Sequence, residues 1–286
     1  MARILSILVG LFFTVALAWS FGKGAYTQIT EPPAATAEKH FHKEPKEYRY
    51  ASDGPFGRFD KQQLQRGFQV YKEVCSACHS LSHVAFRDLA QLGYSEGQVK
   101  TIAAGFQVPG IDPTTGEANM RPGVPTDYFP KPFANDTAAR AANNNAIPPD
   151  LSLMTKAREG GAPYIASLLT GYTEQEGYRN EHGEELLKEF PDAKTPMGLH
   201  FNPYFANLNL AMAPPLSGDG QVEYGPGNPK PTVDQMAQDV SAFLIWTAEP
   251  KLEKRKQTGL AVILFLFFAT ALGYMSYRNV WRNQKH

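Results

Sequence analysis

The sequence predicts a mainly α-helical domain with long loops, followed by a C-terminal transmembrane helix. The chain has 24 glycines and 22 prolines among its 286 residues, which favours long irregular segments over a strand-rich fold. Apolar residues recur at helical spacing in two stretches, and an uncharged run covers Leu260 to Tyr277. Hydrophobic residues make up 43% of the chain, so disorder is excluded as a description of the whole protein.

The charges cancel in total but are unevenly distributed. The chain has 28 basic and 28 acidic residues, of which nine basic and one acidic lie in residues 1–23 and 251–286. Residues 24–250 therefore hold 19 basic and 27 acidic residues, a net charge of −8. This sign disfavours a nucleic-acid partner, because phosphates require basic surfaces. It attracts basic proteins over long range, in a salt-dependent way.

Residues 1–21 are predicted to be a signal peptide or an N-terminal membrane anchor. Ile4 to Phe21 is uncharged and follows Arg3, and Ala16 and Ala18 fit a small-residue cleavage site. The 18 residues of this run are also close to the length that spans a bilayer. The sequence leaves cleavage open, and either form exports the residues that follow.

Residues 22–54 are predicted to be an extended lead-in to the domain formed by residues 55–250. The second half of this segment is polar and contains prolines, and it has no sustained period of 2 or 3.6 residues. The domain then opens with a helix that has Asp60 as its N-cap. Its apolar stripe is spaced by four, three and four residues and consists of Leu64, Phe68, Tyr71 and Cys75.

The rest of the domain is predicted to alternate loops with helices. Residues 107–149 and 195–231 have the composition of loops. Residues 151–172 have helical spacing, but Gly160, Gly161 and Pro163 divide them into two short helices. A last helix begins at Thr232, which forms a capping box with Gln235. Its apolar face consists of Val233, Met236, Val240, Phe243 and Leu244.

Residues 251–286 are predicted to be a membrane anchor helix with a short basic tail. The uncharged run from Leu260 has 18 residues and is bracketed by basic clusters. Four basic residues precede the run and three follow it, so their numbers do not set its orientation. The N-terminal export segment sets it instead. Residues 24–250 are then expected outside the membrane and the tail inside.

The motif that carries chemistry is Cys75-Ser76-Ala77-Cys78-His79, the attachment signature of a c-type haem. Two thiols three positions apart can reach the two vinyl edges of one porphyrin, and the histidine that follows is held under the iron. Three alternatives fit less well. A thioredoxin-like redox pair adjoins a strand in a βαβ unit, a zinc site needs a fourth ligand, and a disulfide leaves His79 unexplained.

The sixth iron ligand must come from another part of the chain. Met212 is favoured because its alanine neighbours leave room for a flat ring and Pro214 and Pro215 stiffen the loop. Methionine ligation raises the haem potential relative to two histidines and leaves no open iron position. Met154 and Met236 lie at apolar helical positions and are predicted to be core residues. The alternatives that remain are Met197, Met120, His200 and His83.

These segments, taken in order over residues 55–286, resemble the cytochrome c1 family, the haem subunits of cytochrome bc1 complexes. The segments that carry the resemblance are GRFDKQQLQRGFQVYKEVCSACHS, NNNAIPPDLSLMTKAREGGAPYIASLLTGY, FNPYFANLNLAMAPPL and TVDQMAQDVSAFLIWTAEPKLEKRKQTG. The resemblance implies a class I cytochrome c-like fold, in which the helix ending at Cys75 packs against the helix from Thr232. It also implies one covalent haem c with His79 and Met212 as axial ligands.

The resemblance further implies a set of haem contacts. Arg158 and Tyr164 match positions that approach the haem propionates. Ala211 departs from the family pattern, which commonly has glycine there. Each remaining contact is an apolar or amide side chain that could equally be ordinary core, and the set is Asn143, Pro148, Pro149, Leu168, Leu169 and Phe205.

The function implied by the resemblance is electron transfer within a respiratory quinol–cytochrome c oxidoreductase. The chain would lie beside cytochrome b, accept electrons from a Rieske iron–sulfur protein and pass them to a basic cytochrome c. It would sit in a bacterial inner (plasma) membrane, with the haem domain periplasmic and the C-terminal tail cytoplasmic. The alternative is an exported, membrane-anchored haem enzyme or ligand sensor with an open iron site. The sequence shows no acid–base pair or nucleophile with placed partners, so no catalysis is expected from this chain alone.

Overall fold

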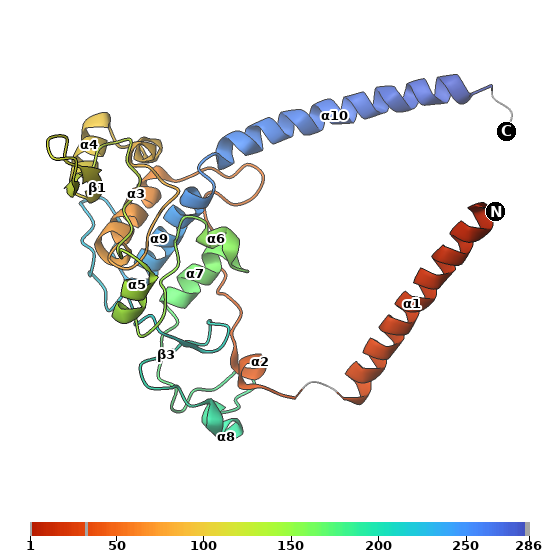
Figure 1. Cartoon of the computed structure of the whole chain (residues 1–286), viewed down its shortest axis with the longest axis horizontal. Helices are drawn as coiled ribbons and strands as arrows, with labels where there is room; N and C mark the ends of the chain where they lie inside the picture. The colour runs from red at the N-terminus through yellow and green to blue at the C-terminus, as the bar shows by residue number, and fades with distance from the viewer. Residues whose placement is uncertain (1, 32–33, 284–286) are drawn as a thin grey trace.

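The centre of the domain is the contact between α3 (Lys61–Val70) and α9 (Val233–Ala248), with α7 (Gly161–Leu169) packed on α9 as well. The computed structural model describes residues 2–31 and 34–283. Two long helices, α1 (Ala2–Thr30) and α10 (Leu252–Trp281), extend away from the domain (Figure 1). The mainly helical fold class expected from the sequence is confirmed.

Helix α3 begins and packs as its sequence predicts. The Asp60 carboxylate accepts hydrogen bonds from the backbone N–H groups of Gln62 and Gln63, at 3.0 and 3.2 Å. Leu64 and Phe68 on the expected stripe are buried. The close approach of α9 requires a residue without a side chain at Gly67, because a Cβ built there would lie 2.0 Å from the carbonyl oxygen of Asp239.

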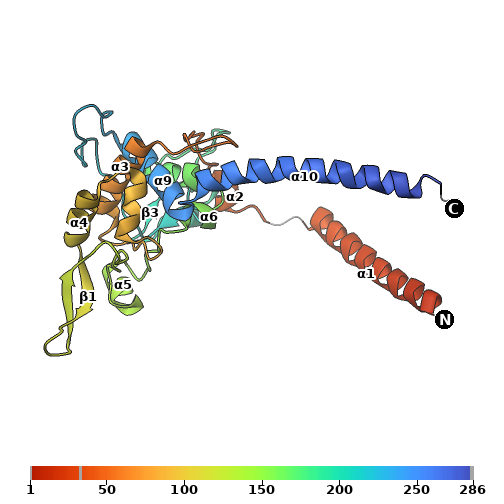
Figure 2. The same ribbon diagram turned by 90° about the horizontal axis from the view of Figure 1, so that it is seen from above.

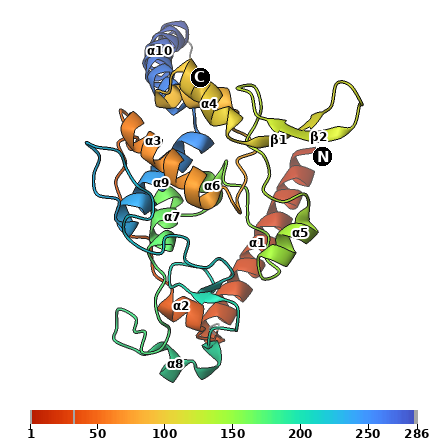
Figure 3. The same cartoon turned by 90° about the vertical axis from the view of Figure 1, so that its left-hand side faces the viewer.

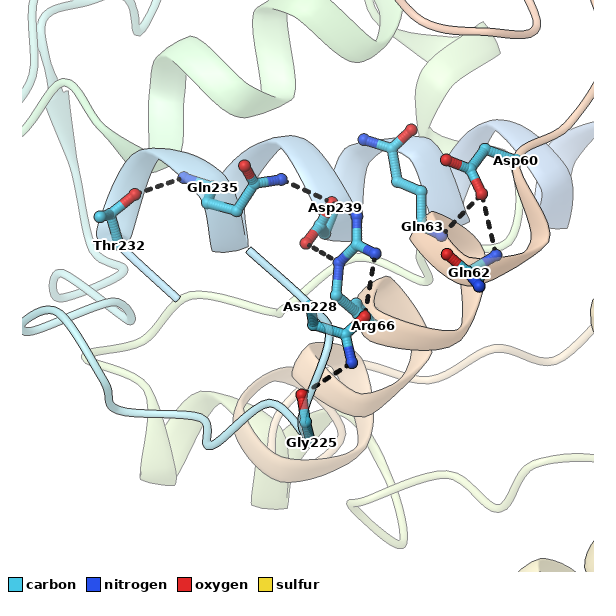
Figure 4. Close-up of polar contacts among 9 residues, drawn as sticks. All are labelled: Asp60, Gln62, Gln63, Arg66, Gly225, Asn228, Thr232, Gln235 and Asp239. Atoms are coloured by element: carbon cyan, nitrogen blue, oxygen red, sulfur yellow. Dashed lines mark hydrogen bonds and ion pairs between the residues drawn. The ribbon is translucent and has the colours of Figure 1, made fainter. Parts of the chain in front are cut away.

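Helix α9 has half of the expected capping box. The Thr232 hydroxyl accepts a hydrogen bond from the Gln235 backbone N–H at 3.1 Å. The Gln235 side chain does not return to the cap and instead donates to Asp239 at 2.9 Å (Figure 4). Asp239 is fully buried and pairs with Arg66 of α3 through bonds of 2.8 and 3.1 Å. This buried ion pair draws the Gln235 amide away from the helix end.

Residues 151–172 form two short helices, as predicted: α6 (Met154–Ala157) and α7. Residues 107–149 contain more regular structure than expected from their composition. They form an antiparallel hairpin of β1 (Gln107–Ile111) and β2 (Ala118–Pro122), in which Gln107 pairs with Pro122, and the helix α5 (Asp136–Ala142). The prolines are tolerated because a two-stranded hairpin consists only of edge strands.

The remaining elements are short. The 3₁₀ helix η2 (Phe86–Leu92) and α4 (Glu96–Ala104) pack together after the cysteine motif. Helix α8 (Leu186–Glu189) and the 3₁₀ turn η3 (Pro191–Ala193) follow α7. Strands β3 (His200–Phe201) and β4 (Asn209–Leu210) pair antiparallel, with His200 opposite Leu210. Figure 3 shows that β3 and its neighbouring loops lie between the α3–α9 core and α8.

The lead-in of residues 22–54 is less extended than expected. Helix α1 continues to Thr30, nine residues past the expected boundary at Phe21, because no proline interrupts the chain before Pro32. A second helix, α2 (Ala37–Phe41), is capped by the Thr36 hydroxyl, and Phe41 is buried in a small cluster. Residues from Ala37 onward therefore belong to the folded domain. The other buried members of this cluster are Leu186, Phe201 and Leu208.

Helices α1 and α10 are the two helices in the described part of the chain that are long and apolar enough to cross a membrane. Neither has any of its apolar stretch buried in the protein (Figure 2). Helix α10 contains the whole run from Leu260 to Tyr277, so the predicted membrane anchor lies on one continuous helix.

Candidate functional site

The cysteine motif follows a local widening of its helix. Residues Tyr71–Cys75 form a π-helical turn, in which the Ser76 N–H donates to the Tyr71 carbonyl at 2.8 Å. Turns of this type recur at functional sites. The N–H groups of Cys78 and His79 then both donate to the Cys75 carbonyl, at 3.1 and 2.9 Å. One tight turn therefore presents both thiols and the imidazole.

The two cysteines are half-buried free thiols. Burial raises the pKa of the Cys75 thiol to about 12, and the charge of Cys78 adds to this rise. A redox-active cysteine needs a lowered pKa, which argues against a thioredoxin-like pair. Among residues 2–31 and 34–283, no group of three or more His, Cys, Asp and Glu side chains could hold a metal ion. The structure therefore gives no support to the zinc alternative.

His79 is oriented by a backbone carbonyl. Its Nδ1 lies 2.8 Å from the Pro149 carbonyl oxygen. Because a carbonyl oxygen only accepts, Nδ1 must carry the proton and Nε2 is left with its lone pair available for iron. Burial lowers the pKa of His79, although the bond to Pro149 opposes this. The neutral imidazole, which is the form that binds metals, is favoured.

Asp150 fixes the two segments that meet at His79, and the sequence analysis missed it. Its carboxylate accepts hydrogen bonds from the Ser80 hydroxyl at 2.7 Å and from the N–H groups of Ser82 and Ser152 at 2.8 and 2.9 Å. Burial raises the pKa of Asp150, but these bonds outweigh it and hold the value at about 2. The sequence pattern that could have predicted this role is an aspartate two residues before a serine and directly after two prolines, which is typical of an Asx turn.

Met212 lies two residues after a short strand and is held through its backbone. The Tyr172 hydroxyl donates to the Met212 carbonyl at 2.9 Å, and β4 ends two residues earlier. The Met212 side chain is half-buried. The ring of His200 lies 6.5 Å from the ring of Tyr172, so His200 also faces this region.

The other candidate ligands have different surroundings. Met197 is fully exposed, and Met120 on β2 is 58% exposed. His83 is exposed, and its backbone N–H bonds the Ser152 hydroxyl. Met154 and Met236 are buried in the core, as predicted from their helical spacing. An iron ligand inside a protein must be shielded from bulk water, so Met212 and His200 are the candidates compatible with burial.

Of the two residues expected near the propionates, Arg158 directly follows α6 and Tyr164 lies on α7. Burial raises the pKa of Tyr164, and the positive charge of Arg158 partly opposes the rise. Burial also raises the pKa of Tyr172, with a further contribution from Tyr164. Arg158 itself is exposed.

The expected pocket residues come from three separate segments. Leu168 and Leu169 lie half-buried at the end of α7. Asn143 ends α5 and donates its side-chain amide to the Ala139 carbonyl at 2.7 Å. Pro148 and Phe205 are half-buried, whereas Pro149 is exposed and contributes its carbonyl to His79. Leu169 packs against the main core, and all of these residues apart from Pro149 are half-buried.

The donor set fits a c-type haem. Two free thiols and an imidazole share one turn, the imidazole Nε2 has no protein partner among the described residues, and a thioether stands in a half-buried loop. The family model described as the Cytochrome C1 family matches residues 50–284. The chain belongs to the cytochrome c1 family. As a member of this family, it is a haem-binding protein.

Known family members cover most of the chain. It is 47% identical over 240 residues to cytochrome c1 of Rhodospirillum rubrum, covering 82% of this chain and 86% of that protein. It is 42% identical over 243 residues to the mitochondrial cytochrome c1 haem protein of Saccharomyces cerevisiae, covering 84% of this chain and 73% of that protein. It is also 44% identical over 241 residues to a protein named cytochrome b/c1 from Bradyrhizobium diazoefficiens, covering 82% of this chain and 35% of that longer protein. These matches confirm the resemblance inferred from the sequence.

Proposed function

We propose that the chain is the electron-transfer subunit of a respiratory quinol–cytochrome c oxidoreductase. Its haem is attached through Cys75 and Cys78 and ligated by His79 and Met212. It accepts electrons from a Rieske iron–sulfur protein and passes them to a cytochrome c. Membership of the cytochrome c1 family makes the chain an electron-transfer haem protein of the cytochrome b-c1 complex, a complex named directly in a 41% identical relative from Candida albicans.

The observation that carries this proposal is the turn at Cys75 to His79 with its bond to Pro149. When bound, the haem supplies a one-electron iron couple. His79 offers Nε2 because Nδ1 is committed to the Pro149 carbonyl. Met212 offers a soft sulfur donor, which favours the ferrous state and raises the potential. With His79 and Met212 both as ligands, the iron would keep no open site, so an electron carrier is favoured over a ligand sensor or a haem enzyme.

The proposed partners are supported by the name of a relative and by the net charge of the domain. The relative named cytochrome b/c1 supports a place beside cytochrome b. The net charge of −8 over residues 24–250 supports a basic cytochrome c as acceptor. The densest acidic tract, residues 174–192, lies in exposed loops around α8. It is a candidate for electrostatic steering of this acceptor.

The proposed location is a bacterial plasma membrane with the haem domain on the periplasmic side. The apolar helix α10 anchors the chain, and relatives in two bacterial species support a bacterial setting. Covalent attachment of haem to a Cys-x-x-Cys-His motif takes place after export, which supports the periplasmic side for the domain. The tail after α10 then lies in the cytoplasm.

Covalent attachment is tested directly by haem staining after denaturing electrophoresis of membranes. The wild type should give a stained band at 31.6 kDa, or a smaller one if the leader is removed. A Cys75→Ser, Cys78→Ser double variant should give none, whereas Ser76→Ala within the same turn should keep the band. Haem that stays with the denatured double variant would disprove the attachment. A reduced-minus-oxidised spectrum of the same membranes then tests whether quinol reduces the haem.

A further inference from the structure

A loop of the domain is bound to the first turns of α10. We name Ser52–Phe59 the junction loop. The Lys256 ammonium donates to the carbonyls of Ser52 and Gly54, each at 2.6 Å. The Glu253 carboxylate accepts the Phe59 N–H at 2.8 Å. In Figure 1 the junction loop, in orange, runs beside the start of α10. The loop and the helix are therefore held as one unit.

A cavity of about 120 Å³ lies between the junction loop and α10. Phe56 and Arg58 line it from the loop, and Lys256 and Leu260 line it from the helix. The cavity combines two basic side chains with apolar ones, and it shares no residue with the proposed haem site.

The cavity lies at the depth expected for lipid headgroups. Leu260 begins the uncharged run, and Lys256 precedes it by one helical turn, about 6 Å along the axis. The polar layer on each side of a bilayer is roughly 5–8 Å thick. Phe56 borders the same cavity and is 77% exposed, although it is a large apolar side chain. Exposure of this kind next to a membrane helix favours contact with lipid rather than with water.

The charges around the cavity favour an anion. Glu253 also lines it, but one of its oxygens is occupied by the Phe59 N–H. Lys256 uses two of its three donors on carbonyls and keeps one. The Arg58 guanidinium has no side-chain partner within the described residues, and its planar fork suits a phosphate.

We propose that this cavity binds the headgroup phosphate of an anionic phospholipid. Arg58 and Lys256 contact the phosphate, and Phe56 lies against the upper part of the acyl chains. The bound lipid would fix the junction loop, and through it the domain, at a set height above the membrane. This site depends on α10 being in a membrane and is independent of the haem chemistry.

The test is lipid binding to the full haem-loaded chain in detergent, measured by native mass spectrometry during titration with phosphatidylglycerol. Arg58→Gln should weaken the tightest binding step about fivefold, because one basic residue near a membrane surface contributes about 1 kcal/mol. Arg87→Gln is the matched control and should leave binding unchanged. The Arg87 N–H bonds Pro125 near the β1–β2 hairpin, which lies at the end of the domain away from the tip of α10 (Figure 2). Unchanged haem spectra verify folding in each variant.

Three results would overturn the proposal. Equal affinity of wild type and Arg58→Gln for phosphatidylglycerol would show that Arg58 does not contact the headgroup. Equal affinity of the wild type for phosphatidylcholine and phosphatidylglycerol would show that the cavity does not prefer an anionic lipid. A photo-reactive residue in place of Phe56 that crosslinks to a protein subunit of the intact complex, and not to lipid, would make the cavity a protein contact.

Discussion

The α3–α9 crossing and the loops that carry the site are held together by different means. The crossing depends on buried apolar side chains, on a close backbone contact at Gly67 and on one buried ion pair, Arg66 with Asp239. The loops at residues 143–152 and 195–216 depend on single polar groups that bond backbone atoms across the chain. Asn202, for example, is fully buried and donates to the Leu168 carbonyl at 2.8 Å. Close packing around one ion pair therefore decides the geometry of the helical part, whereas individual hydrogen bonds decide the geometry of the loops.

The largest effect on stability is expected from Gly67→Ala, which disrupts the packing of the two helices. The added Cβ would lie 2.0 Å from the Asp239 carbonyl oxygen and 2.7 Å from the Phe243 Cβ, and neither atom belongs to a flexible side-chain end. Helices α3 and α9 would have to separate, so we expect a loss of about 3 kcal/mol or more in the free energy of unfolding. Urea unfolding of the detergent-solubilised holoprotein, followed by haem absorbance, measures it.

Gly93→Ala is not a suitable control because Gly93 has a positive φ of 99°. Gly97→Ala is suitable, since Gly97 lies on α4 with open space around its Cα. It should leave stability unchanged or slightly increase it. Equal stability of Gly67→Ala and Gly97→Ala would contradict the close packing of α3 and α9.

A smaller effect on stability is expected from Asp150→Asn, which removes hydrogen bonds in the loops next to His79. The amide cannot accept all three bonds, from Ser80, Ser82 and Ser152, so we expect a loss of about 2 kcal/mol at pH 7. The pKa of Asp150 is lowered to about 2 in the folded protein, so its contribution is complete above the unfolded pKa of about 4 and disappears as the pH falls through 2.

The pH dependence separates this role from simple packing. The stability difference between wild type and Asp150→Asn, measured by urea unfolding, should be constant from pH 7 to 5 and shrink below pH 4. A difference that grows on acidification would contradict the charge-assisted bonds. Asp112→Asn provides a control, because Asp112 bonds only within its own exposed turn at Thr114 and Thr115.

The smallest effect is expected from Tyr172→Phe, which removes one bond on the methionine side. The lost hydroxyl bond to the Met212 carbonyl is worth about 1 kcal/mol. If all of it acts on the ferrous state, the potential falls by about 40 mV. Redox titration measures this shift. Tyr178→Phe is the matched control, because its hydroxyl bonds Phe41 at 3.4 Å in the small cluster; an equal shift in both variants would exclude a specific role for Tyr172.

The same comparison explains what the sequence could predict. Helical spacing located α3, α7 and α9, and the five-residue cysteine motif located the turn proposed to hold the haem, because both signals are local. The contact of Asp150 with Ser82 and that of Tyr172 with Met212 join residues 68 and 40 positions apart, so no short pattern contains them. The prediction of a complete capping box was wrong for the same reason. The Gln235 side chain bonds Asp239, which pairs with Arg66 of a distant segment, instead of bonding the cap. Helix α2 was missed because Phe41 owes its burial to residues from 186 to 208.

The central claim, an iron held between His79 and Met212, is tested most directly by the reduction potential and carbon monoxide binding of Met212→Ala, with Met197→Ala as control. We predict that Met212→Ala binds carbon monoxide in the reduced state and has a strongly lowered potential, because the soft sulfur is gone and an iron position is open. Met197 is fully exposed, and its variant should match the wild type. A Met212→Ala protein with the wild-type potential and no carbon monoxide binding would contradict the account and transfer the ligand role to His200.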